Sequence, residues 1–237
     1  MSPLIRFHHA QSAEALAVDL ASFVAQCLRE GLATRDRALL IVSGGSTPMP
    51  FFKALSGMAL DWSRVVVTLA DERWLPPDHA DSNERLLRAC LLVGAASKAR
   101  FVPLFNGAST PEVAAPALER ELGALPWPAD VVVLGMGGDG HTASLFPHAP
   151  ELVAALAEGE GLRCVPVAVP AAPNVPVPRL SLTRRALLDT RHLIVHVTGA
   201  AKLALLEQAA QDGPLEAWPI RLALHQSRVP CEVFHAD

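Results

Sequence analysis

Several short apolar runs, each followed directly by a glycine-rich or charged loop, constrain the fold of this chain more than any other feature. The clearest are residues 38–42, 65–69 and 130–134, in which valine, leucine and isoleucine dominate. Continuous runs of this length are typical of strands that are buried on both faces, as in a parallel sheet. Helix-like segments separate the runs, and the alternation predicts an α/β fold with a mostly parallel sheet covered by helices.

The remaining elements follow from shorter patterns. Residues 12–30 form an amphipathic helical pattern, and Thr110 followed by Pro111 is typical of the start of another helix. The other predicted helices cover residues 51–55, 82–88 (with Ser82 as N-cap) and 200–210, and the other predicted strands residues 101–102, 163–169, 180–182, 193–197 and 231–235. We find no internal repeat and no long linker, so we expect residues 1–237 to form one domain.

Composition narrows the classes of function. Apolar residues make up 51% of the chain and charged residues 19%, which indicates a packed interior rather than disorder. The net charge of −4 does not favour nucleic acid or an anionic membrane surface as a partner. No segment approaches the ~20 apolar residues that span a bilayer, and the N-terminus lacks a secretory signal. We therefore expect a cytoplasmic protein, a monomer or small homo-oligomer, that acts on a small molecule.

The four cysteines, at positions 27, 90, 164 and 231, are far apart and form no C-x-x-C pair. This spacing favours isolated thiols in a reducing cytosol over a disulfide framework or a zinc site. No other spacing of histidine, cysteine and carboxylate residues suggests a metal site. We expect neither a metal nor another cofactor.

Polar residues gather directly after the predicted strands. In open α/β sheets, ligands bind beyond the carboxyl ends of the strands. This rule selects four loops, which cover residues 43–48, 70–83, 135–147 and 198–202.

The first loop contains Gly44, Gly45, Ser46 and Thr47, followed by Pro48. The glycines allow a tight turn and a close approach of backbone to ligand. Ser46 or Thr47 is expected to cap the next helix, and the free N–H groups at a helix N-terminus favour a phosphate. The alternative is an ordinary strand-to-helix turn.

The second loop contains Asp71, Glu72 and Arg73, and it continues to Asn83. Charged side chains at a strand end are costly to bury without a purpose. Arg73 can bind a phosphate or a carboxylate, and Asp71 or Glu72 can orient a partner or accept a proton. The alternative is a solvated turn that contains a local ion pair.

The third loop runs from Gly135 to Pro147 and centres on His141. Gly137 and Gly138 let a ligand approach the imidazole, and Asp139 is close enough in sequence to orient the ring. Because histidine changes charge near neutral pH, His141 is the candidate general base. The glycine pattern also matches a dinucleotide-binding motif, but Pro147 shortens any following helix and no ribose-binding acid follows a second strand. The structural alternative is a histidine that packs or caps the loop.

Two cations complete the predicted site. Lys202 lies in the first turn of a predicted helix, where the helix dipole disfavours a cation unless an anion is bound nearby. Arg179 can add a second positive charge to the same anion. The alternative for Lys202 is an ordinary solvent-facing lysine.

Taken together, these segments resemble the 6-phosphogluconolactonase family, which is related to the glucosamine-6-phosphate isomerases. The matching motifs are Ser43-Gly-Gly-Ser-Thr-Pro48, Asp71-Glu-Arg73 with Pro76 and Ser82-Asn83, Gly135–Pro147, Arg179-Leu-Ser-Leu-Thr183 and Gly199-Ala-Ala-Lys202. Their order and approximate spacing fit over almost the whole chain. The resemblance implies a Rossmann-like three-layer α/β/α fold. It also implies metal-free hydrolysis of 6-phospho-D-glucono-1,5-lactone to 6-phospho-D-gluconate in the oxidative pentose phosphate pathway.

The expected mechanism follows from the residues and the resemblance together. Lys202, the amides of loop 43–47 and Arg179 hold the phosphate, and His141 deprotonates the water that attacks C1. Loop N–H groups or Arg73 stabilise the oxyanion. The chain departs from many relatives in the proline-rich segment, where Ala172-Pro-Asn174 replaces a basic residue.

Two other functions remain open at this level. A glucosamine-6-phosphate deaminase shares the glycine-rich loop and the lysine. A resemblance to the deaminases, however, implies an aromatic residue at position 73 and an acid near positions 145–147, where this chain has Arg73 and Leu145-Phe146-Pro147. A non-catalytic sugar-phosphate sensor keeps the phosphate loops but needs a DNA-binding module, and no basic helix-turn-helix precedes residue 12.

Overall fold

The computed structural model describes residues 5–159, 161–171 and 174–236. Its central sheet has seven strands in the order β1-β10-β9-β6-β2-β3-β5, and all neighbouring strands are parallel. The bounds of these strands are β1 Ile5–Ala10, β2 Ala38–Val42, β3 Val65–Leu69, β5 Arg100–Val102, β6 Ala129–Leu134, β9 Thr190–Thr198 and β10 Cys231–Ala236. The predicted parallel α/β sheet is confirmed.

A second, antiparallel sheet lies at the carboxyl end of the first. It contains three short strands in the order β4-β8-β7, with bounds β4 Asp71–Arg73, β7 Cys164–Val167 and β8 Arg179–Leu182. The helices are α1 Ala13–Thr34, α2 Met49–Ser56, α3 Asn83–Cys90, α4 Pro111–Gly123, α5 Leu152–Ala155, α6 Arg184–Leu188, α7 Ala200–Ala209 and α8 Arg221–Leu224, with 3₁₀ turns η1 Trp62–Arg64 and η2 Gly94–Lys98.

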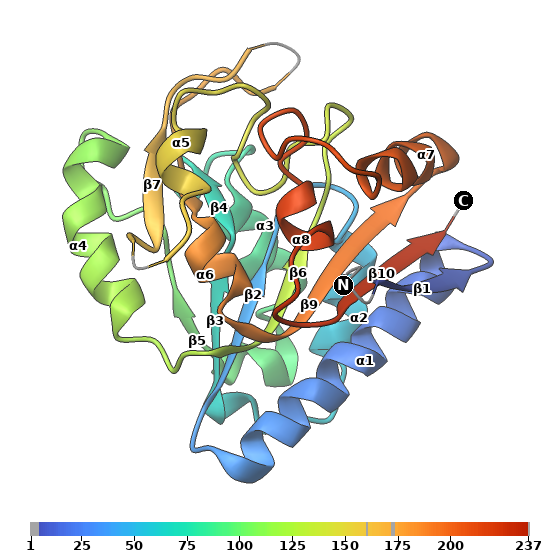
Figure 1. Cartoon of the computed structure of the whole chain (residues 1–237). Coiled ribbons are helices and arrows are strands. Elements are labelled where there is room, and N and C mark those ends of the chain that lie inside the picture. Colours follow the sequence, from blue (N-terminus) through green and yellow to red (C-terminus); the bar gives the residue numbers. More distant parts are fainter. Residues whose placement is uncertain (1–4, 160, 172–173, 237) are drawn as a thin grey trace.

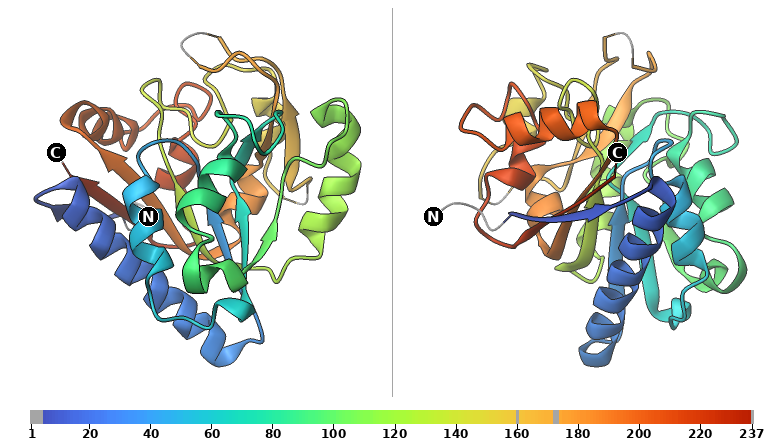
Figure 2. Two further views of the ribbon diagram at one scale, coloured as in Figure 1. Left: turned by 180° about the vertical axis from the view of Figure 1, so that it is seen from behind. Right: turned by 90° about the vertical axis from the view of Figure 1, so that its right-hand side faces the viewer.

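The helices form layers on the two faces of the large sheet. Helices α1, α2 and α3 pack side by side on one face, whereas α6 and α8 lie on the other, which Figure 1 and the right panel of Figure 2 show together. Helix α7 lies beyond the carboxyl end of β9 (Figure 1). The expected three-layer α/β/α arrangement is therefore present.

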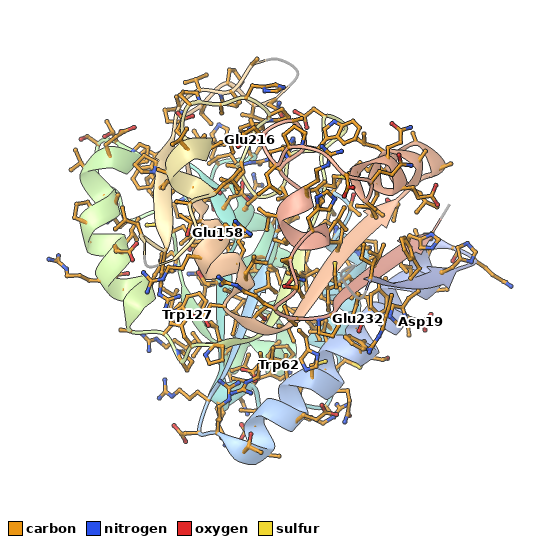
Figure 3. All side chains as sticks on the ribbon, viewed as in Figure 1. Asp19, Trp62, Trp127, Glu158, Glu216 and Glu232 are labelled. Carbon is orange, nitrogen blue, oxygen red and sulfur yellow. The ribbon has the colours of Figure 1, made fainter. Side chains whose placement is uncertain are left out.

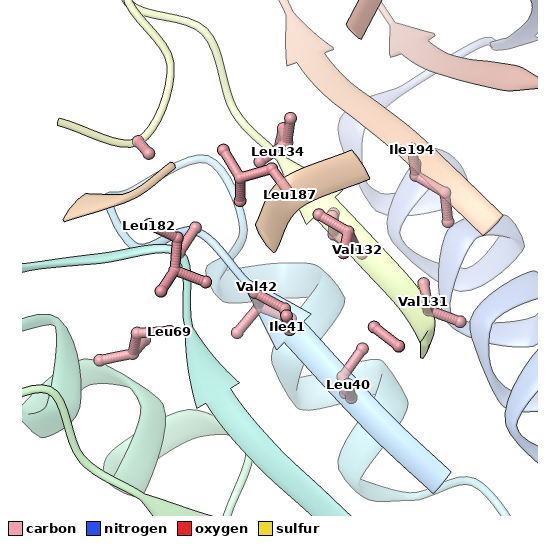
Figure 4. Close-up of a cluster of buried hydrophobic side chains, with 14 of the residues drawn as sticks. Leu40, Ile41, Val42, Leu69, Val131, Val132, Leu134, Leu182, Leu187 and Ile194 are labelled. Atoms are coloured by element: carbon pink, nitrogen blue, oxygen red, sulfur yellow. The ribbon is translucent and has the colours of Figure 1, made fainter. Parts of the chain in front are cut away.

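The centre of the sheet is the most apolar part of the molecule. Every residue of β2 and β3 is buried, as the continuous runs of branched side chains require. Figure 4 shows leucine, valine and isoleucine side chains of β2, β6 and β9 packed beside Leu182 and Leu187 from the segment that covers them. Burial of these side chains is the main force that holds the strands in register.

The amino ends of the strands are closed by large side chains. Trp62, just before β3, is 1% exposed, and Trp127, just before β6, packs against the same core. Both lie toward the lower end of the molecule in Figure 3, away from the loops at the carboxyl ends of the strands. Because this end is filled, the open end of the sheet is the one that the polar loops line.

Local capping explains where several helices begin. The side chains of Ser82 and Thr110 accept hydrogen bonds from backbone N–H groups three residues later, as predicted. The expected cap of α2 by Ser46 or Thr47 is wrong. The N-cap is Pro48, which makes no side-chain cap, because loop 43–48 keeps turning through Ser46 before the helix begins.

Two strands were not predicted. The edge strand β1 pairs with β10, and its sequence Ile-Arg-Phe-His-His-Ala lacks a continuous apolar run because half of it faces solvent. Strand β4 lies within the segment expected to be a charged loop. Its backbone hydrogen bonds come from pairing with β8, and a charged sequence of three residues does not predict such pairing. Its three residues place Asp71 and Arg73 at the carboxyl end of β3.

No helix in the described part of the chain is long and apolar enough to cross a membrane. All four cysteines are buried free thiols, in agreement with the expectation of isolated residues. Burial raises the pKa of Cys27, Cys164 and Cys231 to about 12, so these thiols are unreactive packing residues.

Candidate active site

A cavity of about 220 Å³ opens at the carboxyl ends of the central strands. All four loops selected from the sequence contribute to its wall, so the structure brings them together around one cavity. The lining residues include the predicted Gly44, Gly45, Ser46, Thr47, Asp71, Arg73, Asn83, Gly137, His141, Arg179 and Lys202. Three of these are cations, whereas the chain as a whole carries a net charge of −4. A locally positive cavity in an acidic protein favours a small anionic ligand.

Loop 43–48 reaches the cavity through a tight turn. Gly45 has φ +96°, a conformation that favours glycine. Gly44 packs so closely against the Asn83 side chain that a Cβ atom there would overlap it. Asn83 in turn donates a hydrogen bond from Nδ2 to the carbonyl oxygen of Asp71, at 3.0 Å. Asn83 therefore braces the loop against β4, which holds the loop amides toward the cavity.

The loop after β6 holds His141 through hydrogen bonds of its own backbone. The Gly137 N–H donates to the carbonyl of His141 at 2.9 Å, and the Gly140 N–H donates to the carbonyl of Gly137 at 3.0 Å. Gly140 has φ +82°, and a Cβ atom there would overlap the ring of Trp218. The turn is thus closed on both sides and leaves the imidazole little freedom.

Asp139 orients the imidazole of His141. Its Oδ1 lies 2.5 Å from Nδ1 of the ring, and it also accepts the His141 backbone N–H at 3.1 Å. Burial raises the pKa of Asp139, but the hydrogen bond and charge of His141 outweigh burial and leave the pKa lowered overall. Asp139 is therefore a carboxylate that engages Nδ1, and Nε2 is left for a ligand.

Two residues of the predicted site do not line the cavity: Gly138, which was predicted to contact substrate, and Asp139, which was predicted to orient His141. Gly138 lies outside the lining, with no heavy atom within 4 Å of a Cβ built on it. Asp139 reaches the cavity only through its contact with His141. The turn between Gly137 and Gly140 points these two residues away from the cavity.

Asp71 is buried and tied to the His141 loop. Its Oδ2 accepts a hydrogen bond from the Ser144 hydroxyl at 2.6 Å, and the Ser144 N–H donates to the Ser181 hydroxyl at 3.2 Å. Ser144 is fully buried, at 0% exposure. These bonds join the loop after β6 to both β4 and β8. Asp71 thus acts as a structural link as well as a wall of the cavity.

Arg73 and Arg179 are directly opposite each other on the antiparallel strands β4 and β8. Like charges in this position repel. Burial, followed by the charge of Arg73, lowers the pKa of Arg179, while Asp71 opposes the shift. Among the described residues, neither arginine has a hydrogen-bond acceptor for its Nε. A bound anion would relieve the repulsion and accept the unused N–H groups.

Phe146 connects the arginine pair to the histidine. The guanidinium of Arg179 lies 5.1 Å from the centre of the Phe146 ring, and the ring of His141 lies 4.7 Å from the same centre. His141 and Arg179 therefore share one side of the cavity.

The comparisons with known proteins agree with this geometry. A family model described as glucosamine-6-phosphate isomerases/6-phosphogluconolactonase matches residues 11–231. The chain belongs to this family.

Members of the family resemble the chain along nearly its whole length. A 6-phosphogluconolactonase of Pseudomonas putida is 46% identical over 93% of this chain and 90% of its own, and one of Pseudomonas aeruginosa is 47% identical over 90% and 88%. The crystal structure of a 6-phosphogluconolactonase from Shewanella baltica OS155 superposes with a TM-score of 0.93 at 42% identity, over 98% of both chains. The family resemblance predicted from the loops is confirmed.

Sequence reasoning missed two residues of this lactonase-family site. Ser144 lies within the loop Gly135–Pro147 without lining the cavity, and a serine at that position gave no indication that it would hold Asp71. His196 lies inside the apolar strand β9, where its neighbours predict only a buried strand, yet it lines the cavity. The single polar residue in an otherwise apolar run was the available indication.

Glu72, one of the two acids considered for a functional role, lies outside the cavity lining. It is fully buried, and its carboxylate accepts the backbone N–H groups of Arg73, Asn83 and Glu84 at 2.7–2.8 Å. It also accepts the Ser82 hydroxyl at 3.2 Å. Glu72 thus fastens the N-terminus of α3 to β4, and its role is structural.

This position makes stability depend on pH through Glu72. Burial raises its pKa from 4.5 to about 7, although the backbone hydrogen bonds act to lower it. Between these values the folded chain holds a proton that the unfolded chain releases, so the free energy of unfolding falls as pH rises through the window. We expect this fall, about 3 kcal/mol at full effect, to be absent from E72Q. Urea denaturation of both proteins across the window measures it, and parallel pH profiles would contradict it.

Among the described residues, no group of three or more histidine, cysteine, aspartate or glutamate side chains is arranged to hold a metal ion. The segment Ala172-Pro-Asn174, where many relatives carry a basic residue, lies partly outside the described part of the chain, which lacks residues 172 and 173.

Proposed function

We propose that this chain hydrolyses 6-phospho-D-glucono-1,5-lactone to 6-phospho-D-gluconate, with His141 as the general base and without a metal ion. The observation that carries the proposal is the His141–Asp139 contact of 2.5 Å at a cavity lined by three cations. Membership of a lactonase family and the shared name of its close relatives support the choice of substrate.

The phosphate fits the part of the cavity formed by loop 43–48 and Lys202. The loop offers backbone N–H groups, and Lys202 lies in the first turn of α7. Among the described residues, no carboxylate pairs with Lys202, so its charge is available to an anion. Binding energy gathered at the phosphate can position C1 of the lactone, which lies at the other end of the substrate.

The reacting end of the substrate then lies beside His141. Nε2 of the ring removes a proton from a water molecule as the water oxygen bonds to C1. The resulting imidazolium, held by Asp139, returns the proton to the ring oxygen as the bond between C1 and that oxygen breaks. One water is consumed, and the products are the carboxylic acid and a hydroxyl group. Asp139 contributes by keeping the ring in place and stabilising its cation.

Arg73 and Arg179 are placed to stabilise the oxyanion that forms at C1. Both line the cavity, and Arg179 shares Phe146 with His141. This assignment moves Arg179 from the phosphate, where the sequence predicted it, to the reacting end. Fixed guanidinium groups in a buried site stabilise developing negative charge strongly.

The test compares three substrates with the wild-type chain in excess chelator. We expect rapid hydrolysis of the phosphorylated lactone, a much lower kcat/KM for unphosphorylated glucono-1,5-lactone, and no ammonia from glucosamine 6-phosphate. Equal kcat/KM for the two lactones would refute the assigned role of the phosphate. Ammonia release would favour the deaminase alternative, and activity lost with the chelator would refute the metal-free mechanism.

Lys202→Met is expected to weaken binding of 6-phosphogluconate about 10–100-fold, because a charge-assisted contact to the phosphate is lost. KM should rise by a similar factor, with a smaller change in kcat. Lys53→Met, an exposed lysine on α2 outside the cavity, is the matched control. Calorimetric titration with the product measures the affinity. A K202M enzyme with unchanged affinity and reduced kcat would contradict the assignment.

A further inference from the structure

His196 is a buried histidine that the mechanism above does not use. It lies on β9, two residues before the end of the strand, and it lines the cavity. Its exposure is 5%, and among the described residues its ring makes no hydrogen bond to protein. The ring instead packs edge-on against Phe51 of α2, with centroids 6.2 Å apart at an interplanar angle of 74°. Because the ring lines the cavity and has no protein partner, its N–H is available to a bound ligand.

The surroundings of His196 define what such a ligand can be. Phe51 belongs to the first turn of α2, which follows loop 43–48, and Lys202 is the charged neighbour that acts on the ring. Burial and then the charge of Lys202 lower the pKa of His196 to about 4. The ring is therefore neutral at physiological pH and offers one N–H donor without adding a second positive charge beside Lys202.

We propose that His196 donates a hydrogen bond to the phosphate group of the substrate and thereby helps the cavity to select phosphorylated ligands. Lys202, the amides of loop 43–48 and the imidazole N–H are all donors, and the three terminal oxygens of a phosphate monoester dianion only accept hydrogen bonds. A sugar hydroxyl can accept fewer hydrogen bonds than a phosphate group, so it would leave some of these donors unpaired. The inference rests on the proposed function for the identity of the substrate, but binding of the phosphate group is measurable without any turnover.

The first experiment is calorimetric titration of inorganic phosphate and of 6-phosphogluconate into four proteins: wild type, H196L, H196N and H196Q. We expect H196L to bind both ligands about tenfold more weakly, the effect of losing one hydrogen bond to a charged group. The amide variants should recover much of this affinity, because Asn and Gln side chains keep an N–H donor near one of the two ring nitrogens. H192L, which removes a histidine of the same strand outside the cavity, should bind like wild type.

A purely structural role for His196 predicts a different pattern. In that case the leucine variant, which suits the contact with Phe51, would bind phosphate as tightly as wild type, and that outcome would overturn the proposal. Failure of both amide variants to bind more tightly than H196L would overturn it as well.

A second measurement follows ligand binding in the wild-type protein itself, and variants serve only to assign the signal. The ring nitrogens of the histidines are followed by ¹H–¹⁵N spectroscopy while inorganic phosphate is added. The His196 resonance is assigned as the one that is absent from the spectra of H196N and H196Q. We expect that resonance to shift with the same saturation curve as the calorimetry, and an unmoved resonance at saturation would overturn the proposal. If phosphate moves the resonance but the lactone is not hydrolysed, the proposed function fails while this inference stands.

Discussion

Replacing His141 by alanine is expected to lower kcat for lactone hydrolysis about 10²–10⁴-fold, the usual contribution of a general base. In the proposed mechanism, the imidazole is the only group that transfers a proton. Asp139 does not line the cavity and acts only through its contact with the imidazole. Binding of 6-phosphogluconate should stay close to wild type, because the phosphate is held by Lys202 and loop 43–48. Steady-state kinetics and calorimetry on the same preparations measure the two effects.

The matched control is His79→Ala. His79 lies near a carboxylate as well, with Nδ1 3.8 Å from Asp81, but it is half exposed and outside the cavity. It should retain wild-type turnover. Equal losses of turnover and of product affinity in H141A would indicate that the loop had collapsed, and the general-base assignment would then be wrong.

The second large effect is expected from Gly137→Ala. A Cβ atom at this position would overlap the imidazole of His141 and approach the carboxylate of Asp139. The ring cannot keep its place between Asp139 and the cavity, and displacement of a catalytic group by about 1 Å can cost about 10²-fold in rate. We therefore expect kcat to fall by about that factor, with the fold retained because Gly137 lies in a partly exposed loop at the cavity rather than in the core.

The neighbouring glycine supplies the control. A Cβ atom at Gly138 meets nothing within 4 Å, and its φ does not lie in the left-handed region. Gly138→Ala should therefore turn over at close to the wild-type rate. Melting temperatures of both variants separate catalysis from stability. A G137A enzyme with wild-type kcat, or an equal loss in G138A, would show that crowding of His141 is not the cause.

The parts of the fold that follow from periodicity were predictable. Strands β2, β3 and β6 are buried on both faces, so their sequences are almost entirely apolar and can be recognised alone. Because parallel strands present their carboxyl ends at one edge, the loops after them could be placed together without a structure. His141, Lys202 and loop 43–48 were found for this reason.

The errors have a common physical origin, which is that sequence does not show tertiary partners. Strand β4 has a charged sequence because its side chains bind the N-terminus of α3 and line the cavity, and only its pairing with β8 makes it a strand. Glu72 was considered as a proton acceptor because an acid at a strand end has no visible partner. Its partners are backbone N–H groups, two of them more than ten residues away.

Gly138 and His196 also show that sequence does not reveal tertiary position: the first was predicted in the site and lies outside the cavity, whereas the second lines the cavity and was not predicted. Gly138 belongs to the glycine-rich loop by sequence, but the turn closed by Gly140 carries it away from the cavity. His196 belongs by sequence to an apolar strand, but β9 ends at the floor of the cavity, where one face of the strand becomes accessible to a ligand. Neither outcome can be derived from residue types alone.

The most direct test of the account is the decay of 6-phospho-D-glucono-1,5-lactone, generated in place from glucose 6-phosphate, at low temperature and slightly acid pH. The decay is followed with wild type, with H141A and with buffer alone. We expect a rate that rises in proportion to wild-type concentration, while H141A stays near the buffer rate and still binds 6-phosphogluconate. A wild-type rate equal to buffer would contradict the lactonase function. A rate equal in H141A and wild type would contradict the role of His141.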